Sequence, residues 1–325
     1  MKRFTKACAV AALSLGFGLA ASGASSATFP EKPVRLVLPY PAGGPTDAVS
    51  RVVAERLGAL WGQPVIVDNR PGANGAIGTE VVAKSAPDGY TLLVHSPIML
   101  STELTRPTVR YRTLRDFKPV SIMFASAIFL MAGNEGTQGN LKQVLAAGLQ
   151  HPGELSYGTH GAGTTGHYMG RRLERVSGVE MTHVPFTGDS TILTSLLGGH
   201  IKLGFLSGTG ARKALDSGRV RVLAVASPAR SPLLPDAPTF KEQGFAGFDR
   251  ESWGMLFAPA GTPDDVVNQI ARDVDRVVKQ AEIQQQFSGL GLSAVGGTSA
   301  EARRIVQDDF GYWSKLIEEF GALAQ

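Results

Sequence analysis

Short apolar runs alternate with amphipathic helical stripes along most of the chain. Residues 34–38 form an apolar run that stops at prolines, as a buried strand does before a sharp turn. In residues 48–61 apolar side chains recur every three or four positions, which predicts a helix with one buried face. Strands at 65–67 and 90–95 and a helix at 77–86 follow after short loops. This order predicts a parallel sheet covered on both faces.

The alternation restarts after a long apolar, β-like run at 119–132. Strands are predicted at residues 155–157, 181–186, 201–206, 220–226 and 253–259. Helices are predicted at residues 141–149, 164–176, 190–197, 263–280 and 300–320, with a short one that ends at Asp216. Residues 227–247, rich in proline and glycine, are interpreted as a return connection. The pattern predicts an α/β protein with domain one at 28–128 plus 250–325 and domain two at 129–249, joined by two extended crossovers.

The first 27 residues differ from the rest of the chain. Three basic residues precede an apolar run at 7–21, and small residues end the segment at Ala27. This is the pattern of a secretory signal peptide, so we expect cleavage near Ala27. The apolar run is shorter than the roughly 20 residues that a membrane span needs. We therefore expect a soluble mature protein that is exported to the periplasm.

Charge and cysteine content exclude several classes of function. The formal charge of +4 includes three bases of the predicted signal, so the mature chain carries 4 − 3 = +1. A near-neutral chain does not favour binding to nucleic acid or anionic membranes. The single cysteine, Cys8, lies in the signal, and the six histidines form no H-E-x-x-H motif. We therefore expect no disulfide, no metal site and no cofactor.

Polar loops that contain glycine join several predicted strands to the next helix. Such loops lie at residues 40–47, 160–165, 186–189 and 205–209. Their peptide N–H groups, together with the helix N-termini that follow, can bind a small anion, although a purely structural turn explains each loop alone equally well. Residues 161–166 also match G-x-G-x-x-G, but no acid ends a strand about 20 residues later, which disfavours dinucleotide binding. If the two units face each other, the loops converge on one cleft.

Several longer stretches resemble the Bug family, the extracytoplasmic solute-binding receptors of tripartite tricarboxylate transport systems. They are YPAGGPTD (40–47), NRPGANG (69–75), APDGYTLL (86–93), RDFKPV (115–120), HVPF (183–186), LAVAS (223–227), LPDAPT (234–239) and APAGTP (258–263). The resemblance covers essentially the whole mature chain. It implies a two-domain periplasmic binding protein of type II, the Venus flytrap architecture, with the ligand cleft between the domains. It also implies a small organic acid as ligand and integral membrane transporter subunits as partners.

The resemblance also implies which residues bind the ligand. The predicted contacts in domain one are Tyr40, Pro41, Ala42, Gly43, Gly44, Thr46, Asp47 and Ser96. Those in domain two are His160, Gly161, Gly163, Thr164, Thr165, Phe186, Thr187, Gly188 and Ser207. Where the family usually has Val-Pro-Tyr-Lys-Gly and Phe-Asp-Asn, this chain has Val184–Gly188 as Val-Pro-Phe-Thr-Gly and Phe205-Leu206-Ser207. Thr187 and Leu206 therefore suggest a ligand whose distal end is less polar than that of a tricarboxylate.

Three functions are compatible with this pattern. The first is a monomeric receptor, not an enzyme, that closes on its ligand because only the closed form brings both sets of loops into contact with it. The second is a ligand sensor that docks on a sensor kinase instead of a transporter. The third is an enzyme on the same scaffold, for which His95, Asp47 and His160 are the candidate groups, none with an evident partner.

Overall fold

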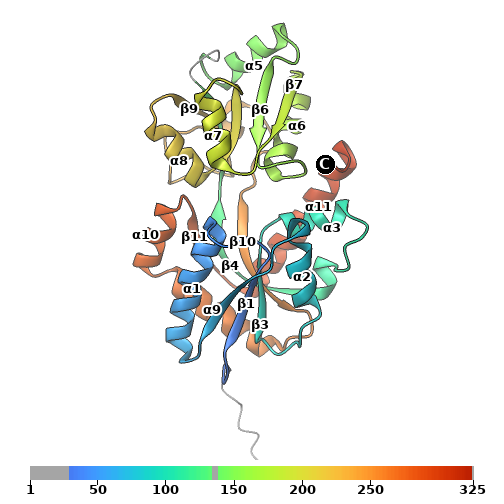
Figure 1. Cartoon of the computed structure of the whole chain (residues 1–325), viewed down its shortest axis with the longest axis vertical. Coiled ribbons are helices and arrows are strands. Elements are labelled where there is room, and N and C mark those ends of the chain that lie inside the picture. Colours follow the sequence, from blue (N-terminus) through green and yellow to red (C-terminus); the bar gives the residue numbers. More distant parts are fainter. Residues whose placement is uncertain (1–28, 134–137, 324–325) are drawn as a thin grey trace, which may run out of the picture.

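The chain folds into two lobes, each built on its own β-sheet (Figure 1). The computed structural model describes residues 29–133 and 138–323, so the predicted signal peptide lies outside the described residues. The first lobe is built from the N-terminal and C-terminal parts of the chain, and the second lobe is inserted between β4 and β10. The described part of the chain ends beside α6 of the second lobe. No helix among the described residues is long and apolar enough to cross a membrane.

The first lobe has a six-stranded sheet with the order β11-β4-β10-β3-β1-β2. Its strands are β1 (Val34–Leu38), β2 (Val65–Asn69), β3 (Thr91–His95), β4 (Phe117–Ser126), β10 (Ser252–Pro259) and β11 (Ser293–Gly296). β1 pairs in parallel with β2 and β3, but β10 runs antiparallel to β3 and β4. The parallel pairing predicted for β1, β2 and β3 is therefore confirmed, and the sheet is mixed because β10 and β11 add antiparallel pairs.

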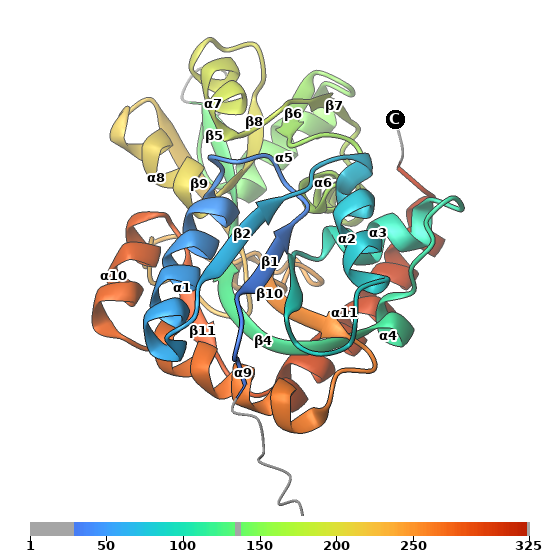
Figure 2. The ribbon, with the colours of Figure 1, turned by 60° about the horizontal axis from the view of Figure 1, so that its bottom comes forward.

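Helices cover both faces of this sheet (Figure 2). One face packs against α1 (Pro45–Trp61), α9 (Asp264–Val278) and α10 (Ala281–Gly289). The other packs against α2 (Ala76–Ala83), α3 (Ile98–Thr105) and α11 (Ser299–Phe320), and the short α4 (Thr113–Asp116) precedes β4. Leu36 and Leu38 of β1 face the first core, whereas Val37 faces the second. Burial on both sides explains why β1 is apolar at every position except Arg35 instead of alternating.

The second lobe has a five-stranded sheet with the order β7-β6-β8-β5-β9. Its strands are β5 (Ile128–Gly133), β6 (Leu155–Thr159), β7 (Met181–Pro185), β8 (Leu203–Ser207) and β9 (Val220–Ala226). Its helices are α5 (Leu141–Gln150), α6 (Thr165–Ser177), α7 (Asp189–Leu197) and α8 (Gly208–Asp216). β6 is parallel to β7 and β8, and β5 is antiparallel to β8 and β9. The apolar run at 119–132 is thus two strands, one in each sheet.

Three segments connect the lobes. The chain crosses once at Ala127, between β4 and β5, and returns after β9 to enter β10. The return segment is anchored on α11, because Arg250 pairs with Asp309 and Trp253 Nε1 donates to Asp309 Oδ2 at 2.6 Å. The end of α11 then contacts α6, where Glu319 pairs with Arg175 at 3.1 Å. The exact division into domains at 28–128 plus 250–325 and 129–249 stays a prediction.

Candidate ligand-binding site

A pocket of about 390 Å³ lies between the two lobes. The first lobe contributes the loop after β1, the loop that contains the 3₁₀ turn Ala73–Gly75, and α3. The second lobe contributes the loop between β6 and α6, and Leu323 from the C-terminal segment completes the wall. The lining residues are Pro39, Tyr40, Pro41, Pro71, Gly72, Asn74, Gly75, Ile98, Ser101, Thr102, Thr105, Arg106, His160, Gly161, Ala162, Gly163, Thr164 and Leu323. A volume of this size suits a small molecule.

Tyr40 is the first lobe's best-fixed side chain in this pocket. Its hydroxyl lies 2.9 Å from His95 Nδ1 and 2.8 Å from Ser96 Oγ, and Ser96 N donates to it at 3.2 Å. Burial raises the pKa of Tyr40 to about 12, and burial lowers the pKa of His95 to about 3. Both groups are therefore neutral near pH 7. Ser96 N also donates to His95 Nδ1 at 2.8 Å, which places the imidazole proton on Nε2.

Asp47 holds the glycine loop that precedes α1. Its carboxylate accepts hydrogen bonds from Gly43 N at 3.0 Å, from Asn69 Nδ2 at 2.9 Å and from Arg51 through Nε and Nη2 at 3.0 Å each. Burial would raise the pKa of Asp47, but these hydrogen bonds and the charge of Arg51 outweigh it and lower the pKa to about 2. Asn69 Nδ2 also donates to Tyr40 O at 3.1 Å. Asp47, which the sequence predicted to contact the ligand, therefore uses all of these hydrogen bonds to hold the loop in place.

The glycines of that loop leave backbone accessible beside the pocket. Gly43 has φ of +89°, and a side chain at Gly43 or Gly44 would meet nothing within 4 Å. Gly44 is the N-cap of α1, and no side chain caps this helix. The N–H groups of its first turn are therefore a candidate anion site, although Ala42, Gly43, Gly44, Thr46 and Asp47 adjoin the pocket without lining it.

The second lobe presents the N-terminus of α6 to the pocket. Thr164 is the N-cap, but its hydroxyl donates to Gly161 O at 2.7 Å and caps no N–H group of the helix. Gly163 N donates to His167 Nδ1 at 3.2 Å, and Thr159 Oγ1 donates to Gly161 O at 3.1 Å. The loop is therefore shaped by its own side chains, and the first turn of α6 keeps its N–H groups for a ligand.

His160, Asp189 and Ser207 form a chain of hydrogen bonds behind this wall. His160 Nε2 lies 2.7 Å from Asp189 Oδ1, and the Ser207 hydroxyl donates to Asp189 Oδ2. Burial would raise the pKa of Asp189, but the hydrogen bonds from His160 and Ser207 lower it. Ser207 Oγ also accepts from Gly210 N at 3.3 Å and caps α8. The serine thus contacts the acid and not the imidazole, an arrangement that provides no activated nucleophile.

The structure brings six of the predicted residues to the pocket and leaves the others outside its lining. Those that line it are Tyr40, Pro41, His160, Gly161, Gly163 and Thr164. Ser96, Thr165, Phe186, Thr187, Gly188 and Ser207 do not line it. Leu206 is completely buried in the core of the second lobe, so its proposed contact with the distal end of the ligand was wrong. Alternation along β8 turns this side chain into the core.

Sequence reasoning missed three parts of the lining. They are the loop at Pro71–Gly75, the α3 segment from Ile98 to Arg106 and Leu323. The first part was predicted only as a short loop before the helix at 77–86, and α3 is too short to give a clear periodic signal. A residue far along the chain such as Leu323 gives no local signal. Among the described residues, no cluster of His, Cys, Asp or Glu could hold a metal ion.

Comparison with known proteins decides the family. Residues 49–322 match the model of the tripartite tricarboxylate transporter family receptor. The chain belongs to this receptor family. The receptor is 33% identical over 293 residues to a protein of Pseudomonas sp. from the tcbD-tcbE intergenic region, with 90% of this chain and 87% of that protein covered. It is 30% identical to protein BugT of Bordetella pertussis over 321 residues, which cover 98% of each chain.

Solved structures of relatives share the fold. An R. palustris protein with adipate superposes with a TM-score of 0.78 at 30% identity, covering 89% of the receptor and 97% of that chain. MatC of Rhodopseudomonas palustris with bound malate gives a TM-score of 0.75 at 29% identity, covering 89% and 100%. The receptor therefore has the two-domain periplasmic binding protein fold, and it is a transport receptor and not an enzyme.

Proposed function

We propose that the receptor captures a small carboxylate in the pocket between its lobes and delivers it to integral membrane transporter subunits. The observation that carries this proposal is the composition of the two walls. The N-terminus of α6, capped by no side chain, lies at the wall of the second lobe beside Gly163 and Thr164. The N-terminus of α1, also uncapped, adjoins the wall of the first lobe without lining the pocket. Two helix N-termini favour an anion.

The neutral state of the nearby groups supports a carboxylate ligand. Tyr40 and His95 stay uncharged near pH 7, and Asp47 is saturated with hydrogen bonds from its own lobe. The negative charge of Asp47 is balanced by Arg51, so it does not repel an incoming anion strongly. The relatives solved with adipate and with malate hold carboxylates of the size that this pocket can accept.

Closure of the lobes is expected because residues of both lobes line the same pocket. A ligand that contacts Tyr40 and the loop at Gly161–Gly163 together binds best when the lobes are close, so it shifts the population toward the closed form. The closed form is then the one that the membrane subunits recognise.

We further propose that the protein acts as a monomer in the periplasm after removal of residues 1–27. The two domains then move relative to each other about the crossovers near residues 128 and 250.

A thermal-shift screen of the ligand-free protein against mono-, di- and tricarboxylates, amino acids and neutral sugars tests this function. A ligand at a hundred times its dissociation constant adds about 2.7 kcal/mol to the free energy of unfolding. We expect at least one carboxylate, and no sugar, to raise the melting temperature by a few degrees. Stabilisation by sugars alone, or chemical conversion of the bound acid, would overturn the proposal.

A further inference from the structure

We propose that Arg106 binds a second negative charge on the ligand, so that the receptor prefers dicarboxylates to monocarboxylates of the same length. The inference rests on the proposed function of the pocket between the lobes. It adds a residue that determines specificity, at a position where the sequence pattern predicted no contact with the ligand.

The charge of the pocket lining is the first argument. No aspartate or glutamate occurs among the described residues that line it, and Arg106 is the one lining residue with a permanent charge. The other polar lining groups are hydroxyls, the amide of Asn74 and the imidazole of His160. An anion at the Arg106 end therefore meets a cation without a competing acid in the lining.

The hydroxyls around Arg106 cannot take its place. Ser101 Oγ donates to Ile98 O at 3.2 Å, and Thr105 Oγ1 donates to Ser101 O at 2.7 Å. Thr102 Oγ1 donates to Asn74 O at 3.4 Å. Because each hydroxyl has one hydrogen and spends it on a backbone carbonyl, α3 offers a ligand mainly acceptor lone pairs. The guanidinium of Arg106 is the strong donor at this end, with the fork geometry that a carboxylate requires.

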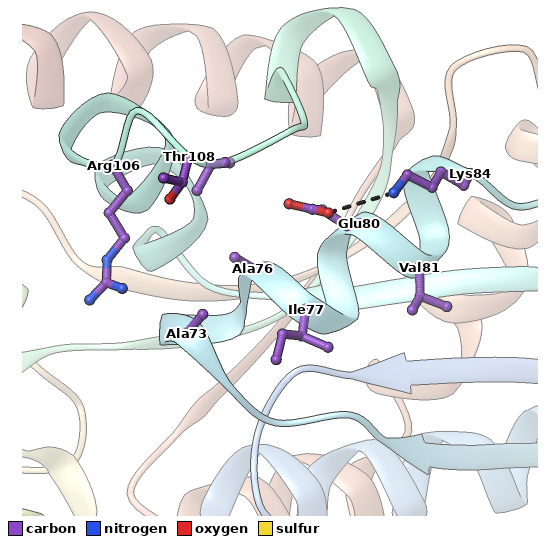
Figure 3. A pocket seen from close by; sticks show the side chains of 9 residues that line it. Ala73, Ala76, Ile77, Glu80, Val81, Lys84, Arg106 and Thr108 are labelled. Atoms are coloured by element: carbon purple, nitrogen blue, oxygen red, sulfur yellow. Dashed lines mark ion pairs between the residues drawn. The ribbon is translucent and has the colours of Figure 1, made fainter.

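The side chain of Arg106 extends away from the acid of the neighbouring groove. Arg106 is the C-cap of α3, with extended backbone at φ −119° and ψ 104°, and a cation is favoured at a helix C-terminus. Figure 3 shows the outer groove that Arg106 also lines, where its side chain extends away from Glu80 and Lys84. Glu80 pairs with Lys84 at 3.6 Å, and no ion pair among the described residues involves Arg106.

Both ends of an extended ligand are then satisfied in one pocket. One carboxylate lies at the N-terminus of α6 beside Gly163 and Thr164, and the other reaches Arg106. These groups line the same pocket of about 390 Å³, which has room for a short chain of carbons between them. The specificity for charge thus comes from the first lobe, whereas Thr187 of the second lobe does not line the pocket.

Isothermal titration calorimetry with matched ligands tests this assignment. Linear dicarboxylates of increasing length are compared with their monomethyl esters, which keep the length and remove one charge. In the unmodified protein we expect the best diacid to bind about tenfold more tightly than its half-ester, the typical effect of one hydrogen bond to a charged group. In Arg106→Gln this preference should disappear through loss of diacid affinity, with the half-ester unchanged. Arg106→Lys should keep part of it.

Arg110→Gln is the matched control, because Arg110 is an exposed arginine of the same segment that does not line the pocket. It should leave the preference intact. Equal loss of diacid and half-ester affinity in Arg106→Gln, or no loss at all, would overturn the role of Arg106 while leaving the proposed function in place. Failure of the unmodified protein to bind any carboxylate would overturn the proposed function itself.

Discussion

In each lobe an aspartate lies in the first turn of a helix whose N-cap is a glycine, and the two aspartates have different hydrogen-bond partners. Asp47 in the first turn of α1 is bound by Arg51 and Asn69. Asp189, the first residue of α7, is bound by His160 and Ser207. Arginine carries its charge at every accessible pH. The acid of the first wall is therefore paired with a permanent cation, whereas the acid of the second is held by hydrogen bonds from an imidazole and a serine.

The two walls also differ in how closely other atoms surround one glycine in each, Gly75 and Gly161. A side chain at Gly75 in the first wall would lie 2.7 Å from His95 Nε2, whereas one at Gly161 in the second wall would meet only Phe186 O at 4.0 Å. Packing is therefore tight around the buried imidazole at Gly75 and open at Gly161, whereas a side chain at Gly163 of the second wall would lie 3.1 Å from Leu323 O.

The largest expected effect comes from adding one methyl group to each wall. Gly75 has φ of +88° and Gly161 has φ of +113°, so alanine is strained at both positions. Gly75→Ala also clashes with buried His95 and should lower the free energy of unfolding by about 3–4 kcal/mol, the sum of backbone strain and overpacking. Gly161→Ala should cost about 1–2 kcal/mol, from strain alone. Urea unfolding measures both values.

A third glycine serves as the control for this pair. Gly62, the C-cap of α1, has φ of +65° and open space where a side chain would lie. Gly62→Ala should therefore cost about as much as Gly161→Ala. Equal losses at Gly75 and Gly161 would show that the packing around Gly75 is not the tighter one.

The next largest effect separates the two acids. Asp47→Ala removes the acceptor for Gly43 N, Asn69 and Arg51, and should lower the free energy of unfolding by about 2 kcal/mol. Asp189→Ala, whose partners are one imidazole and one serine, should cost about 1 kcal/mol. Urea unfolding at pH 7 gives both values, with Asp308→Ala on the exposed face of α11 as the control. A larger loss at Asp189 would reverse the comparison.

The sequence predicted most of the fold because the relevant signals are local. Strand β1 and helix α1 follow from one apolar run and one helical stripe, and the glycines of the loop between them mark a strand-to-helix turn. The direction of β10 could not be predicted in this way, because it depends on a connection through the whole second lobe. Pairing between distant segments has no signature in either segment alone.

The candidate site was predictable only where it coincides with such turns. Tyr40 and Thr164 lie in strand-to-helix loops and were expected. Arg106 was not, because its position at the pocket depends on how α3 packs beside the loop at Asn74. Asp47 was read as a contact for the ligand, but its partners Arg51 and Asn69 show a brace, and the i, i+4 spacing of Asp47 and Arg51 on a helix was the signal for it.

The last effect, about 1 kcal/mol per pH unit, is a dependence of stability on pH whose lower limit differs between His95 and His167. Burial lowers the pKa of His95 to about 3, and burial together with the charges of His183 and Arg171 lowers the pKa of His167 to about 4. Both values lie below the usual 6.5, so the unfolded chain binds these protons first. The stabilisation is complete above about pH 6.5 and is lost as the pH falls toward the folded values, by about 1 kcal/mol per histidine between pH 6 and pH 5.

Substitution by asparagine should separate the two contributions, because its amide oxygen can replace Nδ1 as acceptor for Ser96 N or Gly163 N. In urea unfolding from pH 7 to pH 3, His95→Asn should flatten the profile over the whole range. His167→Asn should flatten it only down to about pH 4, where the native imidazole itself becomes protonated. If His95→Asn and His167→Asn both leave the slope unchanged, neither histidine contributes to the dependence of stability on pH.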